Sequence, residues 1–485
     1  MINQPPPQSL SRRLFLGGSV AAAAVVGGAG NLVLATAAGA APETAATINP
    51  VVRERADPWL IKHSDGRYYF TGSVPEYDRI VLRSSSTIAG LEDATETVVW
   101  TRPSSGVMGG HIWAPELHHF DGQWHIYFAA GNSDNVFAVR IYVISNWSAD
   151  PLAGTWSAPA RVFTHEDSFS LDATTFEHNG LRYLVWAQTE AGVNSSLFIA
   201  IMSGSSTLSS AVTRIATPSY EWETRGYRVN EGAAVIRRNG RIFISYSASA
   251  TDANYCMGLL TADENADLLN AASWTKSPTP VFTTNEGTKQ YGPGHNSFST
   301  DEEGNDILVY HARSYWNIVG DPLYDPNRHA RVQRLYWNAD GTPNFGVPVG
   351  DGELPVRLRP ASAADQFIVH DGLNLTVSAS ANSTTELPTS QFRVAPGYGK
   401  KGSIVIEPIL TKGRYLRVEG DKVVVAATPN SSSAFNRRKG LSDSSGWSFE
   451  SIDFPGSFLR VVDGVLGLSK VDSAQKASAT FYPEG

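Results

Sequence analysis

The chain has a single cysteine, Cys256, among its 485 residues. One cysteine excludes an internal disulfide, and it also excludes a metal cluster built from several thiolates of this chain. Basic residues are in short supply too, since 39 Lys and Arg stand against 47 Asp and Glu and the formal net charge is -8. Proteins that bind the nucleic-acid backbone usually present a basic surface, so this composition argues against a nucleic-acid partner and favours a neutral polymer.

Long apolar runs are missing from the chain beyond its first 41 residues. Near the start, Arg12 and Arg13 precede a run rich in Ala and Gly over residues 17–38, and small residues follow up to Ala41. This order is typical of a twin-arginine export signal. A permanent membrane anchor is the alternative, because the run approaches spanning length, although its Gly and Ala make it weakly hydrophobic. The sequence predicts a signal peptide over residues 1–41 and a secreted, extracellular protein without membrane contact once the signal is removed.

Helical periodicity is also scarce, and five strand-like repeats take its place. Each repeat begins with a turn pair and continues as an aromatic-rich strand. The turn pairs are Asp65-Gly66, Asp121-Gly122, Asn179-Gly180, Asn239-Gly240 and Glu303-Gly304. Asp-Gly and Asn-Gly pairs readily adopt the positive φ of tight hairpin turns. The pairs start 56, 58, 60 and 64 residues apart, which is enough for about four strands per unit. The spacing predicts an all-β fold with a five-bladed β-propeller over residues 50–348.

A shorter repeat follows the fifth unit. Three strands that begin with an aromatic residue start at Phe367, Tyr415 and Phe458, which are 48 and 43 residues apart. Three units of this size predict a β-trefoil over residues 362–485, with the last unit completed by pairing of the segment's two ends. Residues 349–361 contain Gly and Pro and are expected to be a linker.

Four ionisable residues stand at similar distances before the turn pairs. Asp57, Asp172, Glu231 and His295 lie 8, 7, 8 and 8 residues before their turns. They are therefore expected at equivalent positions on the innermost strands of four blades, converging on one rim of the channel. A single carboxylate is usually solvated or a capping group. Three buried together cost on the order of several kcal/mol unless they are paired or partly protonated, a pattern that points to function. Their repulsion raises the pKa of one group, and glycosidic bond cleavage needs such an acid beside a base.

Five short segments, one in each expected blade, resemble a known family. They are Arg55-Ala56-Asp57-Pro58, Trp113-Ala114-Pro115-Glu116, Leu171-Asp172-Ala173, Asn230-Glu231-Gly232 and Gly292-Pro293-Gly294-His295. Together they resemble glycoside hydrolase family 43 over nearly all of residues 50–348. The resemblance implies a five-bladed propeller and inversion at the anomeric carbon, with Asp57 as general base and Glu231 as general acid. It also implies that Asp172 tunes the pKa of the acid and orients the sugar. Inversion requires about 6.5–9.5 Å between acid and base.

Further residues are candidates for binding. Three aromatic side chains are candidate walls of a sugar pocket, with ordinary blade packing as the alternative: Trp59, His111 and Trp113. Arg331 either pairs with Asp172 at the channel mouth or lies on the surface. Relatives in the family hold a Ca²⁺ or Na⁺ ion in the channel, largely through waters and one histidine, so the resemblance implies such an ion at His295. A satisfied core histidine is the alternative, since hard cations prefer oxygen ligands.

The C-terminal segment resembles the arabinofuranose-binding β-trefoil family, on residues 447–451 and 454–460. The sugar pockets of that family use a histidine after each aromatic-Leu-Arg triplet. Here the histidine remains only at His370, and Val418 and Val461 take its place in the other repeats. His370 therefore marks the one repeat that keeps this feature of a sugar site, and a purely structural trefoil is the alternative.

These observations predict a secreted, inverting, exo-acting α-L-arabinofuranosidase that acts on arabinan or on arabinosyl side chains of plant cell-wall polysaccharide. The propeller carries the reaction type, and the trefoil indicates the sugar. Other activities of the family stay open because loop residues choose among them, namely β-xylosidase, endo-arabinanase and galactofuranosidase. A non-catalytic, carbohydrate-binding propeller is a further alternative, although a binding site has no need of an acid and a base.

Overall fold

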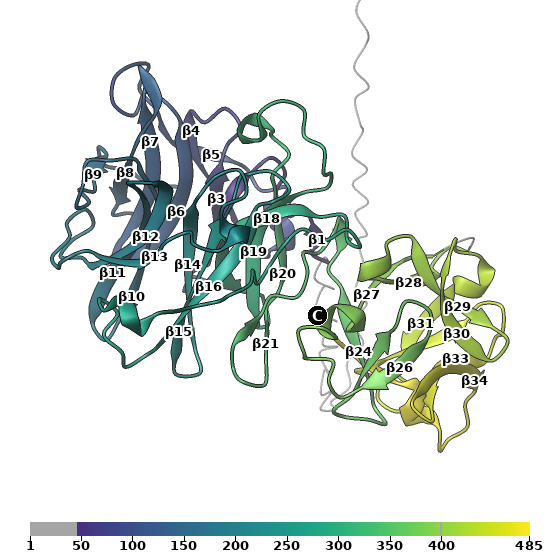
Figure 1. The fold of residues 1–485 in the computed structure, drawn as a ribbon. Coiled ribbons are helices and arrows are strands. Elements are labelled where there is room, and N and C mark those ends of the chain that lie inside the picture. Colours follow the sequence, from purple (N-terminus) through teal and green to yellow (C-terminus); the bar gives the residue numbers. More distant parts are fainter. Residues whose placement is uncertain (1–45, 398–399) are drawn as a thin grey trace, which may run out of the picture. The chain divides into compact units, whose positions relative to one another are not determined.

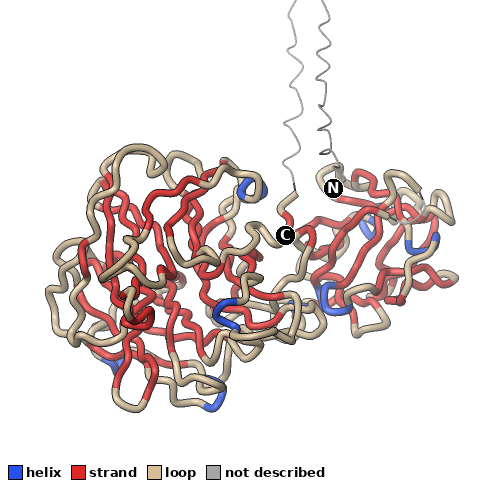
Figure 2. The backbone as a smooth tube through the Cα atoms, turned by 90° about the horizontal axis from the view of Figure 1, so that it is seen from above, coloured by secondary structure: helices blue, strands red, loops and turns tan. Residues whose placement is uncertain are grey.

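A computed structural model describes residues 46–397 and 400–485, so the predicted signal peptide lies outside the described residues. The described chain is built from antiparallel sheets, and Figures 1 and 2 show strands throughout with only short helical turns. The helical turns are η1 (Ala89–Leu91), η2 (Glu221–Glu223), η3 (Ala271–Ser273), η4 (Pro322–Tyr324), η5 (Leu387–Ser390), η6 (Ile409–Thr411), η7 (Ser431–Ser433) and η8 (Lys476–Ala479). Within the described residues, no helix has the length and hydropathy needed to span a bilayer.

Five sheets of consecutive strands form the blades of a propeller, which confirms the predicted fold (Figure 1). The first two blades consist of β2 (Ala56–Lys62), β3 (Tyr68–Ser73), β4 (Arg79–Ser85) and β5 (Thr97–Thr101), and of β6 (Ile112–Phe120), β7 (Gln123–Asn132), β8 (Asn135–Asn146) and β9 (Ala160–Arg161). The third and fourth consist of β10 (Ser170–His178), β11 (Leu181–Glu190), β12 (Val193–Ile201) and β13 (Thr213–Ala216), and of β14 (Asn230–Arg238), β15 (Arg241–Ala248), β16 (Cys256–Asp263) and β17 (Thr275–Lys276). The fifth has three strands, β18 (Tyr291–Thr300), β19 (Asp306–Arg313) and β20 (His329–Arg334).

The start of the described chain completes the edge of the fifth blade. The N–H of Val51 donates to the carbonyl of Ala330, and the N–H of Ala330 donates to the carbonyl of Val52, both at 2.9 Å. The Asn49 side chain donates to the carbonyl of Val332 at 2.8 Å and accepts from its N–H at 2.9 Å. This pairing joins the first and last parts of the ring, so β20 does not present an open edge there.

Large aromatic side chains fill the space between neighbouring blades. Trp124 of β7 and Tyr69 of β3 are buried in one apolar cluster, with ring centroids 5.2 Å apart. Burial of each such side chain contributes roughly 1.5–3 kcal/mol to folding. The aromatic residues after each turn pair therefore hold the blades in register around the channel.

The C-terminal strands form one twelve-stranded sheet of paired hairpins. They are β24 (Val356–Pro360), β25 (Phe367–His370), β26 (Leu375–Ser378), β27 (Gln391–Pro396), β28 (Ile404–Pro408), β29 (Arg414–Glu419), β30 (Lys422–Ala427), β31 (Phe435–Lys439), β32 (Trp447–Ser451), β33 (Ser457–Val462), β34 (Val465–Lys470) and β35 (Phe481–Glu484). The middle residues of the three repeated triplets, Ile368, Leu416 and Leu459, share its core. β24 pairs with β35, which joins the two ends of the segment as a trefoil requires.

The pairing of β24 corrects the predicted linker. Residues 356–360 belong to the trefoil sheet, because the last repeat needs them as the partner of β35. Two short ladders lie nearby in the sequence: β1 (Ile48–Asn49) pairs with β23 (Gly352–Glu353), and β21 (Tyr336–Trp337) pairs with β22 (Pro343–Asn344).

Candidate active site

Every innermost strand carries a β-bulge at which one residue has a positive φ. These residues are Asp57, Ala114, Asp172, Gly232 and His295, with φ between 44° and 56°. A positive φ is strained for residues other than glycine, and such residues cluster at functional sites. A bulge also turns the side chain away from the regular alternation of the strand. Asp57, Asp172 and His295 therefore occupy equivalent positions and meet at one side of the channel.

Glu231 does not share that position, so the expectation of four matched positions was wrong for this residue. In the hairpin registers, Glu231 aligns with Leu171, the residue before Asp172, and Gly232 takes the position of the bulge. The turn pair was a poor reference point because the distance from bulge to turn differs by one residue between blades. The bulge, rather than the turn, fixes the position of each side chain.

Serine hydroxyls from neighbouring blades hold two of the bulges. The N–H of Ala114 donates to Oγ of Ser73 at 2.8 Å, and the N–H of His295 donates to Oγ of Ser247 at 2.7 Å. The Ser73 hydroxyl in turn donates to Oδ2 of Asp57 at 2.6 Å. The two N–H bonds cross from one blade to the next, whereas the bond from Ser73 to Asp57 lies within the first blade. The Ser73 side chain therefore fixes both a strained bulge and the first carboxylate.

Asp57 lies among groups that favour its ionised form. Nδ1 of His295, Nδ1 of His311 and Nη1 of Arg328 lie 3.3, 3.5 and 3.6 Å from Oδ1 of Asp57. His311 also accepts the N–H of Asp57 through Nδ1 at 3.0 Å. Burial raises the pKa of Asp57, but the charges of His295, Arg328 and His311 and the bond from Ser73 outweigh it and lower the pKa to about 2. Asp57 is therefore an ionised carboxylate over the whole physiological range.

Asp172 has the opposite environment. Burial, followed by the negative charges of Glu231 and Asp57, raises the pKa of Asp172 well above its usual value. Its Oδ2 accepts the N–H of Gly232 at 3.0 Å and lies 3.9 Å from Nδ1 of His295. Asp172 thus contacts the backbone of the residue that follows Glu231.

Glu231 is the protonated partner of the ionised Asp57. Burial and the charge of Asp57 raise the pKa of Glu231 to about 7, against a hydrogen bond from Tyr255 and the charge of Arg328. The Tyr255 hydroxyl donates to Oε1 of Glu231 at 2.9 Å. The Tyr255 ring is stacked on His311, with an interplanar angle of 9°. Below neutral pH the site therefore holds one carboxyl group that is mostly protonated and one that is ionised, which is the requirement for paired acid and base catalysis.

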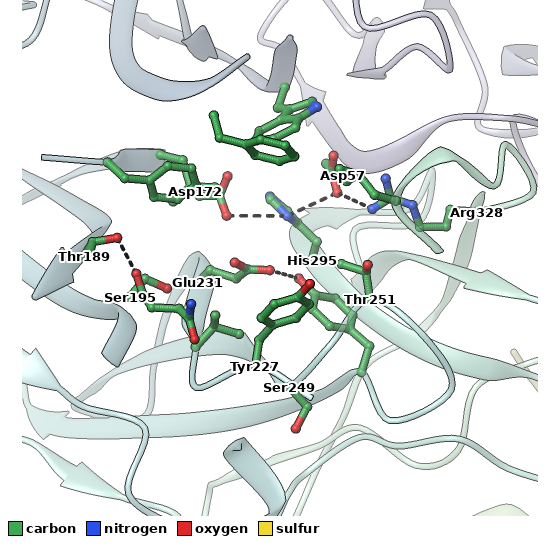
Figure 3. A pocket seen from close by; sticks show the side chains of 18 of the residues that line it. Asp57, Asp172, Thr189, Ser195, Tyr227, Glu231, Ser249, Thr251, His295 and Arg328 are labelled. Carbon is green, nitrogen blue, oxygen red and sulfur yellow. Dashed lines mark hydrogen bonds and ion pairs between the residues drawn. The ribbon is translucent and has the colours of Figure 1, made fainter. Parts of the chain in front are cut away.

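The three carboxylates line one cavity of about 490 Å³. Figure 3 shows Asp57 and Glu231 on different strands, with His295 beside both Asp57 and Asp172. Trp113, Phe137 and other apolar side chains form part of the wall, and Tyr227 and Asn194 add polar groups. A mostly apolar pocket of this volume with a few converging polar groups is typical of a small-molecule or sugar site.

The structure places the three predicted aromatic residues differently. Trp113 lines the cavity. His111 stacks on Trp113 with ring centroids 4.9 Å apart, so it supports the wall from behind. Trp59 does not line this cavity; its Nε1 donates to the carbonyl of Leu117 at 2.6 Å, and the residue lines a separate cavity of about 340 Å³. Trp59 is therefore blade packing with respect to the carboxylate pocket.

The predicted contact between Arg331 and Asp172 is wrong. The Arg331 side chain is fully buried, and its Nη2 donates to Oδ1 of Asp351 at 2.6 Å. The middle of β20 directs Arg331 into the blade, whereas Arg328, directly before β20, reaches Asp57. The arginine of the site comes from the start of the strand because the channel lies at that end.

Sequence reasoning missed three residues of the site: Arg328, Tyr255 and Tyr77. Nη2 of Arg328 donates to the Tyr77 hydroxyl at 2.8 Å, and Tyr255 contacts the acid as described above. These residues come from segments outside the innermost strands, and no repeat or motif marks them. Their spacing in the chain gives no signal, because blade closure alone brings them together.

His295 is the only predicted metal ligand. Within the described residues, no group of three or more His, Cys, Asp and Glu side chains could hold a metal ion. Nε2 of His295 is buried and has no hydrogen-bond partner, while Nδ1 faces the carboxylates. A free buried nitrogen fits an ion held by one histidine with water as the remaining ligands, as the resemblance implied. The cation itself stays a prediction.

His370, the predicted sugar contact of the trefoil, is buried in its own hairpin. Nδ1 accepts the N–H of Gly372 at 3.1 Å, and the ring lies edge-on to Phe392 with centroids 6.0 Å apart. Nε2 has no partner among the described residues. One nitrogen thus serves the turn and the other is buried without a partner, and sugar binding at His370 stays a prediction.

A propeller whose pocket holds an ionised carboxylate and a protonated one is the architecture of a glycoside hydrolase. Comparison with known proteins agrees. Residues 47–343 match Glycosyl hydrolases family 43, and residues 424–485 match the Alpha-L-arabinofuranosidase B (ABFB) domain. The chain belongs to glycosyl hydrolases family 43, and the resemblance seen in its five segments is confirmed.

Three relatives extend the comparison. The chain is 50% identical over 446 residues to an extracellular exo-alpha-(1->5)-L-arabinofuranosidase of Streptomyces avermitilis, covering 90% of this chain and 92% of that protein. It is 49% identical over 455 residues to alpha-L-arabinofuranosidase 43 of Humicola insolens, covering 90% and 94% of the two chains. The crystal structure of alpha-L-arabinofuranosidase from Lactobacillus brevis is similar with a TM-score of 0.61 and 50% identity, over 63% of this chain and 97% of that one.

Proposed function

We propose that the protein is an exo-acting α-L-arabinofuranosidase that releases terminal arabinose from arabinan or arabinoxylan. The observation that carries the proposal is the identity of about half of all residues, over 90% of the chain, with relatives named arabinofuranosidases. The match of residues 424–485 to a domain named after arabinofuranosidase B supports the same sugar. The relative from Streptomyces avermitilis is named an exo-acting enzyme, and this supports attack at a chain end.

In the proposed reaction, Asp57 is the base and Glu231 is the acid. Asp57, with a pKa of about 2, takes a proton from a water molecule as the water oxygen bonds to the anomeric carbon. Glu231, with a pKa of about 7, gives its proton to the glycosidic oxygen as the bond from that oxygen to the anomeric carbon breaks. The products are arabinose of inverted configuration and a shortened polysaccharide, and a second proton exchange with water restores both carboxyl groups.

Asp172 and His295 support this pair. Asp172 accepts the N–H of Gly232, so it fixes the backbone beside the acid, and it lines the pocket in which the sugar would bind. His295 would hold the predicted Ca²⁺ or Na⁺ through Nε2, and such an ion would add positive charge near the carboxylates. Metal analysis of the purified protein and activity after chelation test the ion; no step above depends on it.

A product profile tests the proposed function. The enzyme should release 4-nitrophenol from the α-L-arabinofuranoside but not from the β-D-xyloside, and should release monomeric arabinose from debranched arabinan and arabinoxylan. Oligosaccharides alone would indicate an endo-arabinanase, and xylose release would indicate a β-xylosidase. Release from a galactofuranose polymer would indicate a galactofuranosidase, and no release from any substrate would indicate a binding protein. Proton NMR of the first product tests inversion, since a retained anomer would contradict the assigned roles.

We also infer that residues 1–41 export the folded protein by the twin-arginine route. The two arginines before a weakly hydrophobic run support this, and two relatives are named extracellular. Replacement of Arg12 and Arg13 by lysine should retain the protein inside the producing cell, whereas continued secretion of the double variant would argue for another route.

A further inference from the structure

Glu223 is a fully buried carboxylate in η2, between the third and fourth blades, and the proposed reaction does not use it. Its side chain has an exposed fraction of 0%. Oε2 accepts the N–H groups of Ser219 and Tyr220 at 2.8 Å each. Nζ of Lys276 lies 2.6 Å from Oε1 and 2.7 Å from Oε2. A buried ion pair is expensive to desolvate and is retained only where hydrogen bonds satisfy it, as they do here.

The same carboxylate contacts the strand that carries the proposed acid. Oε1 of Glu223 accepts from Nδ2 of Asn230 and from the hydroxyl of Tyr246, both at 2.9 Å. Asn230 directly precedes Glu231, and its carbonyl accepts from Oγ of Ser195 in the third blade at 3.2 Å. The residue before Glu231 is therefore held on one side by Glu223 and on the other by a neighbouring blade.

The ion pair also anchors a segment of the pocket wall. Residues 217–229 connect β13 to β14, and Tyr227 and Val229 of this segment line the cavity. Nζ of Lys276 donates to the carbonyl of Thr217 at 2.7 Å, so the pair fixes the start of the segment. One buried charge pair thus connects the wall of the pocket with the backbone of the acid.

We propose that Glu223, with Lys276 as its charge partner, is a positioning residue that aligns Glu231 with the glycosidic oxygen. The inference rests on the proposed role of Glu231 as the proton donor. Loss of alignment slows proton donation steeply, because a displacement of about 1 Å can cost on the order of a hundredfold in rate. Attack of water beside Asp57 involves other strands and is affected less.

The leaving group separates this role from a merely structural one. Arabinobiose needs protonation of its leaving oxygen, whereas 2,4-dinitrophenolate leaves without it. In Glu223→Gln the side chain keeps its size, but an NH₂ group replaces one carboxylate oxygen. The donors that bonded to that oxygen then lose their acceptor. We expect kcat for arabinobiose to fall about tenfold to a hundredfold and kcat for the dinitrophenyl arabinofuranoside to fall less than about threefold. Glu231→Gln should give the same pattern more strongly.

The matched control is Glu221→Gln, which changes an exposed carboxylate of the same short helix, η2. It should behave like the wild type on both substrates. Equal losses on both substrates in Glu223→Gln, or a change in KM alone, would overturn the inference. If that variant does not fold, Tyr246→Phe removes a single hydrogen bond to Glu223. Its kcat for arabinobiose should then fall more than its kcat for the dinitrophenyl arabinofuranoside. A wild-type enzyme inactive on both substrates would instead overturn the proposed function.

Discussion

The Tyr255 hydroxyl donates a hydrogen bond of 2.9 Å to Oε1 of Glu231, the group proposed as the acid. A hydrogen bond to a carboxylate favours its ionised form, so this contact opposes the burial that raises the pKa of Glu231. Tyr255 lies in the segment before β16, and its ring is held by stacking on His311. The tyrosine therefore both orients the acid and limits how far its pKa rises.

Removal of that hydroxyl tests the balance. In Tyr255→Phe the pKa of Glu231 should rise above about 7, because a hydrogen bond that favours the ionised form is lost while burial and the charge of Asp57 remain. The alkaline limb of the kcat/KM profile should then move to higher pH, while kcat falls because the acid is less well oriented. A pH profile of the variant and the wild type measures both effects. An alkaline limb that stays in place or moves to lower pH would contradict the assignment.

The wild-type pH profile follows from the two carboxylates. Glu231 must be protonated to act, so kcat/KM should fall tenfold per pH unit above its pKa of about 7. Asp57 must be ionised, and its pKa of about 2 keeps it so at every pH at which the fold is expected to survive. The profile should thus have an alkaline limb and no acidic limb in the moderate range. An acidic limb near pH 5, with the fold intact by circular dichroism, would assign the base to another group.

The loss of kcat should depend on the leaving group of the substrate when the acid is replaced, but not when the base is replaced. Asp57→Asn removes the proton acceptor for water and should lower kcat by about 10²–10⁴-fold for arabinobiose and the dinitrophenyl arabinofuranoside alike. Glu231→Gln should lower kcat strongly only for arabinobiose. Steady-state rates of the two variants on the two substrates make the comparison. The opposite pattern would exchange the two roles.

The fold and half of the site could be predicted from local patterns. Asp-Gly and Asn-Gly turns need a positive φ, so Asn179-Gly180 and its equivalents mark hairpins without any knowledge of the rest of the chain. Asp57 and Asp172 were found because a repeated fold places repeated positions together. Both inferences depend only on distances along the sequence.

The rest depended on contacts that sequence spacing does not encode. Glu231 was placed one position away from its true register because the turn, rather than the bulge, served as the reference. Arg331 was predicted to reach the site and does not, because strand alternation can be read only once the start of β20 is known. Tyr255 contacts Glu231 across two strands, and neither the residue types nor their spacing along the sequence predicts this contact.

The trefoil offers a test that is independent of catalysis. His370→Ala should weaken adsorption to insoluble arabinan without changing kcat on a small aryl arabinofuranoside, if the repeat that keeps His370 binds sugar. A pull-down on the polysaccharide, with binding of the wild type as reference, measures this. Unchanged adsorption would favour a purely structural trefoil.

Gly232 has a positive φ at the bulge and packs closely against His295 of the proposed active site. Its φ is +56°, and a Cβ at this position would lie 3.0 Å from Cγ of His295. Gly232→Ala should therefore add about 1–2 kcal/mol of backbone strain and also displace His295, which lies beside Asp57. Gly180→Ala is the matched control, because its φ is +73° and its Cβ would meet nothing within 4 Å. Both variants should lower Tm, but only Gly232→Ala should lower kcat by more than about tenfold. Equal activity of the two variants at a temperature where both are folded would mean that His295 tolerates the shift, and that the close packing of Gly232 serves the fold rather than the reaction.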